Sequence, residues 1–278
     1  MSGQVHHASA NDATPTLSRA AGGAERRLNA RQLLDRAAKR ALDLAIALVI
    51  IVLCLPVLVA CAVAIKVESR GPVFYRARRA GVNGKDLRVV KFRKMHHGSA
   101  GEALTEDRDP RFTRIGRFLA RTRLDELPQL FNVVTGGMSI VGPRPEAHSF
   151  VSLHADAYEK ILTVRPGITG LCQLAFAKET EILDPRDRVA HYVERILPQK
   201  VALDVLYANT RTVGLDIRVI FWTILPVLLR KDVAVHRATL KLSLRQRQRR
   251  EDEQAAEQAE GESSNGASAR PLETSRPS

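Results

Sequence analysis

A long apolar run dominates the first third of the chain. From Leu44 to Ile65 there are 22 residues without a charge, enough for a helix to cross a bilayer. Pro56 lies near the middle of the run, where a proline bends a helix because it lacks a backbone amide. The pattern predicts a membrane helix over residues 38–66, bent at Pro56.

Basic residues flank both ends of this run and bear on its topology. Lys39 and Arg40 precede it, and Lys66 and Arg70 follow it. Lys and Arg prefer the cytoplasmic side of a membrane, so a straight span would leave one cluster outside. A helix bent at Pro56 can return to the face it entered, and we favour this re-entrant hairpin. The alternative is a single span that tolerates the proline.

The pattern then changes to short extended segments and short helices. Residues 72–78 and 86–92 flank Asn83-Gly84, a dipeptide typical of tight hairpins, so we predict a small β-hairpin. Residues 111–123 have apolar positions at helical spacing and many arginines. Those arginines face phosphates or lipid headgroups, or they form a solvated basic face over a packed apolar one.

Two adjacent carboxylates, Asp125 and Glu126, follow this basic segment. Pro128 is tolerated in a first helical turn, which predicts that the next helix begins near Asp125 and ends at Gly136-Gly137. An acid pair at a helix start is commonly surface charge that offsets the helix dipole. Such a pair can also hold a divalent cation or attack an electrophile, and the nearby guanidiniums, which bind phosphate oxygens, suggest chemistry on phosphate.

The second half of the chain offers loops and two further helices. Residues 142–146 and 166–170 read as rigid Gly/Pro turns, the first of which presents Arg144. Residues 186–209 are predicted to be helical with a break at Pro198, and Asp204 and Tyr207 share one face in a structural role. The uncharged stretch 219–229 is an interfacial helix or a buried core helix.

Composition narrows the function classes. The net charge of +13 implies an anionic partner, which could be nucleic acid, an anionic membrane or a phosphorylated substrate. Aromatic residues make up only 5% of the chain and do not interleave with the basic segments, which argues against nucleic acid. Three scattered cysteines are too few for a disulfide framework or a zinc site.

Together these patterns predict an α/β, mainly helical protein. It comprises a re-entrant membrane helix hairpin and a compact cytoplasmic catalytic domain with a small β-hairpin and interfacial amphipathic helices. The expected parts are a disordered N-terminal segment (1–37), the membrane helix (38–66), the catalytic domain (67–232) and a disordered tail (233–278).

The motifs resemble those of the bacterial sugar transferases, the small monotopic polyprenyl-phosphate phosphoglycosyl transferases, over roughly residues 38–231. The resemblance implies the small form of the family, without a preceding block of membrane helices. The matching segments are Lys39-Arg40 with Asp43, Gly71 to Arg76, Lys91 to Arg93, Asp109 to Leu119, Leu124 to Val133, Met138 to Glu146 and Arg165 to Gly170.

This resemblance implies a reaction and a setting. A sugar phosphate would pass from a nucleotide sugar, usually UDP-linked, to membrane polyprenyl phosphate at the cytoplasmic face of the bacterial inner membrane. Asp125 would be the nucleophile that forms a covalent phosphosugar, and Glu126 would assist at Mg²⁺, which both acids hold. The product would start exopolysaccharide, O-antigen or other glycan assembly. Five basic residues are predicted to bind substrate phosphate: Arg144, Arg111, Arg117, Lys91 and Arg93.

Partners and rival functions follow from the same residues. The expected partners are the nucleotide sugar, polyprenyl phosphate and membrane lipids, with a homodimer and downstream glycosyltransferases as further expectations and no nucleic acid. The rivals are a non-catalytic scaffold that binds anionic lipid or protein, and a membrane-tethered nucleic-acid binder. The chain departs from the family pattern at Leu55, Lys94, Arg123, Gly137 and Cys172.

Overall fold

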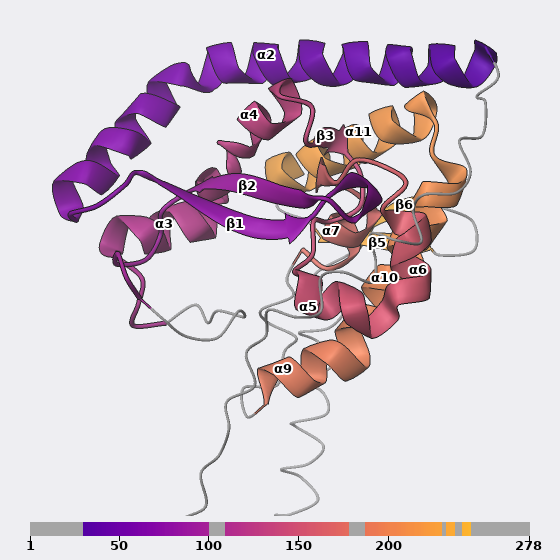
Figure 1. Ribbon diagram of the computed structural model, residues 1–278. Coiled ribbons are helices and arrows are strands. Elements are labelled where there is room, and N and C mark those ends of the chain that lie inside the picture. Colours follow the sequence, from indigo (N-terminus) through magenta and orange to yellow (C-terminus); the bar gives the residue numbers. More distant parts are fainter. Residues whose placement is uncertain (1–29, 100–108, 178–186, 230–231, 237–240, 246–278) are drawn as a thin grey trace, which may run out of the picture. The chain divides into compact units, whose positions relative to one another are not determined.

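The computed structural model describes residues 30–99, 109–177, 187–229, 232–236 and 241–245. The chain divides into two compact units, residues 1–223 and 224–278. Residues 1–29, most of the predicted disordered N-terminal segment, lie outside the described residues. Figure 1 shows the first unit, in which a long helix lies against a β-hairpin and several short helices.

The long helix is α2 (Ala30–Glu68), 39 residues that continue through Pro56. It begins at Ala30, within the segment predicted to be disordered. Over Leu33–Glu68 it is long and apolar enough to cross a membrane by length and composition. Figure 1 shows that α2, in indigo, changes direction along its length, and Pro56 lies inside it without an amide to donate.

Polar side chains on both sides of the apolar run of α2 contact the rest of the first unit. Directly before the run, Asp43 accepts hydrogen bonds from the Ser139 hydroxyl at 2.8 Å and the Ile140 amide at 3.0 Å. At the end of the helix, Glu68 accepts from the amides of Arg114 and Ile115, the first residues of the next helix. The apolar middle of α2 is therefore held at both ends by the same unit.

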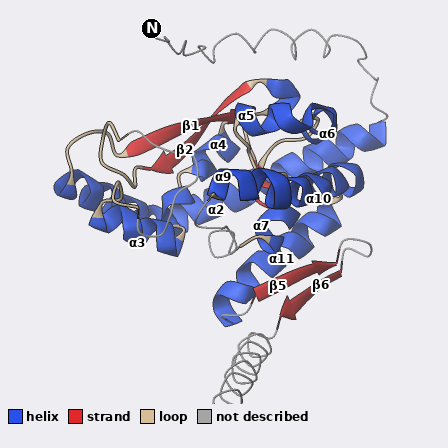
Figure 2. Cartoon of the chain, turned by 90° about the horizontal axis from the view of Figure 1, so that it is seen from below, coloured by secondary structure: helices blue, strands red, loops and turns tan. Residues whose placement is uncertain are grey.

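The predicted β-hairpin is confirmed. Strand β1 (Phe74–Ala80) pairs antiparallel with β2 (Asp86–Phe92), and Ala80 lies opposite Asp86. Asn83 and Gly84 both have positive φ in the connecting 3₁₀ turn η1 (Val82–Gly84), a conformation that these two residue types tolerate. Figure 2 shows the hairpin in red.

The segment with the acid pair differs from its prediction. Helix α3 (Arg114–Thr122) ends where Arg123 adopts φ 59°, and a 3₁₀ turn, η2 (Leu124–Glu126), follows. Helix α4 (Gln129–Val134) begins only after Pro128, so the helix start predicted near Asp125 is wrong. The left-handed Arg123 closes α3 and opens a separate tight turn. The predicted stop is confirmed, because Gly136 has φ 87°.

Two Gly/Pro segments lie side by side. Strand β3 (Ser139–Val141) pairs parallel with β4 (Gly167–Thr169). A Cβ on Gly142 would meet the Arg165 carbonyl, and one on Gly167 would meet the Gly142 amide. Only residues without a side chain allow this approach, so the turns predicted at 142–146 and 166–170 pack on each other.

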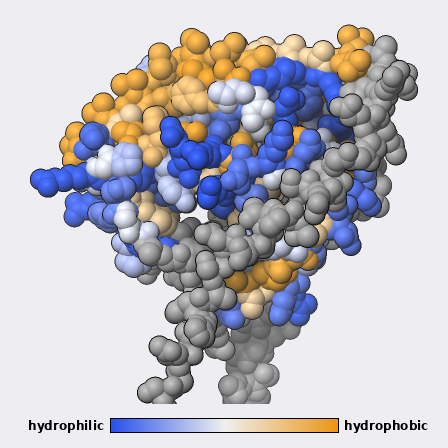
Figure 3. Space-filling view, in the orientation of Figure 1, coloured by the Kyte–Doolittle hydropathy of each residue, from blue (hydrophilic) through white to orange (hydrophobic). Residues whose placement is uncertain are grey.

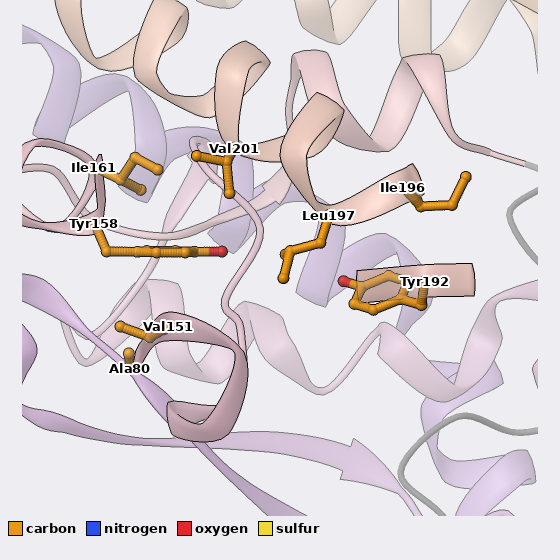
Figure 4. Close-up of a cluster of buried hydrophobic side chains, with 8 residues drawn as sticks. All are labelled: Ala80, Val151, Tyr158, Ile161, Tyr192, Ile196, Leu197 and Val201. Atoms are coloured by element: carbon orange, nitrogen blue, oxygen red, sulfur yellow. The ribbon is translucent and has the colours of Figure 1, made fainter. Parts of the chain in front are cut away.

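The predicted helical region 186–209 is helical and changes geometry before Pro198. It comprises α9 (Arg188–His191), a π-helical turn η4 (Tyr192–Ile196) and α10 (Leu197–Thr210). Tyr192, Leu197 and their neighbours form a buried core with residues of other segments, drawn in Figure 4. The remaining elements of this unit are α5 (His148–Val151), η3 (Ser152–His154), α6 (Ala155–Ile161) and α7 (Leu171–Ala175).

Helix α11 (Val213–Leu229) runs from the first unit into the second. In the second unit, β5 (Asp232–His236) pairs antiparallel with β6 (Lys241–Arg245). This hairpin corrects the prediction of a disordered tail from residue 233, because alternating apolar and polar positions favour paired strands. Residues 246–278 of that tail lie outside the described residues.

Candidate active site

The acid pair lies among basic side chains. Asp125 is buried, with 3% of its surface exposed. Lys94 Nζ lies 3.9 Å from its Oδ2. Lys91 Nζ lies 2.9 Å from Oε1 of Glu126, and Arg144 Nη2 lies 4.0 Å from the same oxygen. Each carboxylate of the dipeptide thus faces its own lysine, as expected for neighbours that point in different directions.

Glu126 is held in its ionised form. Burial acts to raise its pKa, but the charges of Lys91 and Arg144 and the hydrogen bond from Lys91 outweigh burial. The result lowers the pKa of Glu126 from 4.5 to about 2. This carboxylate is therefore a permanent negative charge at neutral pH, suited to a cation and poorly suited to carrying a proton.

Asp125 is shifted in the opposite direction. Burial raises its pKa above the ordinary value of 3.8, and the negative charge of Glu126 adds to the rise, while Lys94 and Lys91 oppose it. Burial also lowers the pKa of Lys94 against the pull of Asp125. A poorly solvated carboxylate is more nucleophilic than a hydrated one, and the two acids therefore have distinct chemical roles.

The turn that carries the pair is fixed from both sides. The Asn132 side chain accepts from the Val90 amide and donates to the Arg88 carbonyl, joining α4 to β2. Arg40 of α2 donates to the carbonyls of Val133 and Val134, which caps the C-terminal end of α4. These contacts set Lys91 on β2 opposite Glu126.

Arg144 is presented by a turn with little freedom. Pro143 and Pro145 fix φ on either side of it. The Gly142 amide donates to the Thr169 carbonyl, and the Gly167 amide donates to the Pro143 carbonyl. The guanidinium thus projects toward Glu126 from a rigid backbone.

Of the three other residues predicted to bind phosphate, Arg93 and Arg111 make contacts elsewhere, and no contact with the acid pair is seen for Arg117 within the described residues. The Arg93 guanidinium donates to the carbonyls of Arg70 and Ser69, just after α2. Arg111 forms an ion pair with Asp109 at 2.6 Å. Arg117 is half-buried on α3, and within the described residues its Nε has no hydrogen-bond partner. Lys91 and Arg144 are therefore the predicted phosphate ligands that the structure brings to the acid pair.

The sequence predicts that Asp125 and Glu126 bind Mg²⁺. Among the described residues there is no group of three or more His, Cys, Asp or Glu side chains that could hold an ion. Mg²⁺ in nucleotide sites commonly takes one or two carboxylates and completes its shell with substrate phosphate and water. Asp125 and Glu126 fit such a partial donor set, with the ionised Glu126 as its anionic anchor.

Sequence reasoning missed two groups of residues at or behind this site. Lys94 was noted only as a departure from a family pattern, yet its ammonium lies beside Asp125. Glu146, buried behind the Arg144 turn, accepts from Tyr192 at 2.9 Å and from Lys200 at 3.2 Å. A lysine at an otherwise apolar helical position could have signalled a buried partner for Glu146.

Known proteins share these motifs. The model of the bacterial sugar transferase family matches residues 34–230. The UDP-glucose:undecaprenyl-phosphate glucose-1-phosphate transferase of Escherichia coli is 39% identical over 201 residues, which are 69% of this chain and 40% of that protein. The UDP-N-acetylgalactosamine-undecaprenyl-phosphate N-acetylgalactosaminephosphotransferase of Aeromonas hydrophila is 36% identical over 68% of this chain and 43% of its own length.

A third relative matches over nearly its whole length. The exopolysaccharide production protein PSS of Rhizobium leguminosarum is 38% identical over 209 residues, which are 71% of this chain and 98% of that protein. By contrast, the chain spans about 40% of the length of the Escherichia coli relative. The matched region contains the acid pair, the Arg144 turn and all of α2 except its first four residues. The chain belongs to the bacterial sugar transferase family.

Proposed function

We propose that this protein transfers a sugar phosphate from a UDP-sugar to undecaprenyl phosphate in the bacterial inner membrane. The names of the relatives support the two substrates, and PSS supports a role in exopolysaccharide production. The observation that carries the proposal is the geometry of the acid pair: a buried Asp125 beside Lys94, next to a Glu126 kept ionised by Lys91 and Arg144.

The first step is attack by a carboxylate oxygen of Asp125 on the sugar-bearing phosphorus. A P–O bond to that oxygen forms, the P–O bond to the nucleoside monophosphate breaks, and UMP leaves with the electron pair. Lys91, Lys94 and Arg144 offset the repulsion between a carboxylate and a diphosphate, because preorganised cations act strongly in a partly buried site.

The second step regenerates Asp125. A phosphate oxygen of undecaprenyl phosphate attacks the same phosphorus, and the bond to Asp125 breaks to give the undecaprenyl diphosphate sugar. Asp125 and Glu126 would hold Mg²⁺ together with the substrate diphosphate, where the ion would neutralise charge on the phosphate oxygens. Glu126 remains ionised through both steps because its pKa is low.

The placement of α2 supports a re-entrant anchor. Arg40 and Asp43 before its apolar run, and Glu68 after it, all bind the same compact unit. A helix that crossed the bilayer would separate those ends by the membrane, so both ends belong on the cytoplasmic face. Figure 3 shows hydrophobic side chains along α2. The exposed ones include Leu48, Val49, Val52, Leu53, Leu55, Val57, Val59 and Val63.

Two further helices would lie at the membrane surface. Helix α3 exposes Phe118 together with Arg114 and Arg121, an apolar side chain among basic ones. Helix α11 exposes Ile217 and Phe221, four residues apart on one face. Apolar contacts by these side chains and basic contacts to anionic headgroups would hold the active site at the headgroup plane, within reach of both substrates.

The test is to trap the intermediate. Purified protein is incubated with Mg²⁺ and either UDP-glucose or UDP-N-acetylgalactosamine, without undecaprenyl phosphate, and analysed by intact mass and peptide mapping. A sugar-phosphate adduct should form on Asp125 with release of UMP, and undecaprenyl phosphate should remove it. Turnover of either donor without an adduct would overturn the covalent route, and no turnover of either would favour a non-catalytic scaffold.

A further inference from the structure

A buried polar cluster behind the active site is not used by the proposed chemistry. Glu146 follows the Arg144 turn directly, and its Oε1 accepts from the Tyr192 hydroxyl at 2.9 Å and from Lys200 Nζ at 3.2 Å. Lys200 also donates to the Tyr192 hydroxyl at 2.8 Å. The three side chains form a closed triangle, and Tyr192 and Lys200 are at most 3% exposed.

The negative charge of Glu146 in this triangle is balanced by the positive charge of Lys200, although both side chains are buried. Burial acts to raise the pKa of Glu146, but Lys200, Arg144 and the hydrogen bonds outweigh it, so the carboxylate stays ionised. A buried ion pair is a weak source of stability, because desolvation cancels much of the attraction. The contacts of this triangle do, however, fix the position of Glu146.

The triangle holds one end of the Arg144 turn. Besides the side-chain contacts of Glu146, its carbonyl accepts from the Ala80 amide at 2.9 Å, at the end of β1. On the other side, the Arg144 amide hydrogen-bonds the carboxyl of Asp204, which is 1% exposed. Burial raises the pKa of Asp204 well above its ordinary value, against the opposing charges of Lys200 and Arg144. Lys200 and Asp204 both belong to α10.

We propose that Tyr192, Lys200 and Asp204 are positioning residues that aim the Arg144 guanidinium at the substrate phosphate. None of them is assigned to contact substrate. They act by fixing the backbone on both sides of Arg144, through Glu146 and through the Arg144 amide. The inference rests on the proposed function, because Arg144 matters only if phosphate is bound there.

The core around Tyr192 supplies a matched control. In Figure 4 the hydroxyls of Tyr158 and Tyr192 both point inward toward Leu197. Both tyrosines belong to one buried core. Of these two hydroxyls, that of Tyr192 donates to Glu146, and within the described residues no hydrogen bond joins Tyr158 to Glu146. Tyr158→Phe therefore removes a hydroxyl from the same core without removing a hydrogen bond to Glu146.

The experiment is a double-mutant cycle on UMP release from UDP-glucose or UDP-N-acetylgalactosamine with undecaprenyl phosphate. Tyr192→Phe should lower kcat/KM about tenfold, since small displacements of a positioned group cost that much or more. In the Arg144→Gln background, Tyr192→Phe should lower kcat/KM less than about twofold, because the guanidinium that Tyr192 positions is already absent. Tyr158→Phe should cost little in both backgrounds. Lys200→Met, which removes the cation, should show the same non-additivity as Tyr192→Phe.

If Arg144→Gln reduces turnover too far for kcat/KM to be measured, ligand binding can be measured instead. The rise in melting temperature caused by UDP-glucose should shrink in Tyr192→Phe and stay at the parent value in Tyr158→Phe. Equal losses for Tyr192→Phe in both backgrounds, or an unchanged ligand response, would overturn the positioning role and leave the proposed function intact. A parent protein that turns over neither donor would overturn both.

Discussion

Lys91 and Glu126 form the tightest ion pair at the acid dipeptide, with 2.9 Å between Nζ and Oε1. The pair comes from two segments that are 35 residues apart, β2 and the turn before α4. This pair keeps Glu126 ionised. The cation that faces Asp125 is Lys94, whose Nζ lies farther away, at 3.9 Å from Oδ2. The difference predicts separate responses of the two acids to pH and mutation.

The pKa of Glu126 predicts how the stability of the fold depends on pH. Because the folded state lowers this pKa from 4.5 to about 2, the ionised carboxylate stabilises the fold above pH 4.5. That contribution is lost as the pH falls from 4.5 toward 2. The melting temperature of the parent in detergent should exceed that of Glu126→Gln near neutral pH, and the gap should close in this window. A gap that stays constant down to about pH 2 would contradict the assignment.

Asp125→Asn should abolish turnover. The amide keeps the shape of the side chain but cannot attack phosphorus, so UMP release should fall about 10³-fold or more, the scale seen when a nucleophile is removed. Asp86→Asn is the control, since Asp86 is a solvent-exposed acid at the start of β2. Its variant should turn over like the parent. Residual activity of Asp125→Asn within tenfold of the parent, about 1.4 kcal/mol of barrier, would remove Asp125 as the nucleophile.

Lys94 should set the acid limb of the pH profile. Asp125 must be ionised to attack, and Lys94 lowers its pKa against the effect of burial. Lys94→Met should therefore raise the pKa of Asp125 and move the acid limb of kcat/KM to higher pH. Lys85→Met, at an exposed lysine of the hairpin loop, should leave the limb in place. An acid limb that is unmoved or shifted to lower pH in Lys94→Met would show that this lysine does not act on Asp125.

The topology of α2 can be tested with single cysteines. In a chain whose native Cys54, Cys61 and Cys172 are replaced by Ala, Leu33→Cys and Val67→Cys place a thiol near each end of the helix. Both positions are exposed. An impermeant maleimide should label both only after the inner membrane is opened. Labelling of Leu33→Cys in intact spheroplasts would establish a spanning helix.

Gly116 should be intolerant of even a methyl group. A Cβ at this position would meet the backbone of Lys94, because α3 packs closely on the segment after β2. Gly116→Ala should destabilise the protein by about 1–3 kcal/mol, as expected for overpacking, and should reduce turnover by displacing Lys94. Gly214→Ala is the control, since its Cβ would make only an ordinary contact with Thr212. Equal melting temperatures for the two variants would contradict the close packing.

Local patterns predicted the elements that depend on neighbouring residues. Three features each follow from a few adjacent residues: the apolar run up to Ile65, the Asn83-Gly84 turn, and the end of α4 just before Gly136. The helix start near Asp125 was wrong because Arg123 adopts a left-handed conformation. Such a conformation is rare outside glycine, asparagine and aspartate, and residue type gives no warning of it.

Local sequence patterns could not predict which side chains from distant segments would contact one another. Arg93 was predicted to bind phosphate like Lys91, yet its guanidinium bonds Ser69 and Arg70, because the chain after α2 leaves carbonyls that need a donor. Lys200 and Glu146 are 54 residues apart and meet only in the folded core. Periodicity identifies which residues are buried but does not identify their partners.

Arg40 and Asp43 also constrain how the protein can be shortened. A chain begun after residue 43 would lose the cap on the last carbonyls of α4 and the acceptor for the Ile140 amide. Those groups would be left without partners beside the active site, each at a cost of about 1–3 kcal/mol. Removing all residues up to the end of α2 to obtain a water-soluble enzyme should therefore yield an unstable protein. An N-terminal truncation that begins at residue 39 keeps these contacts.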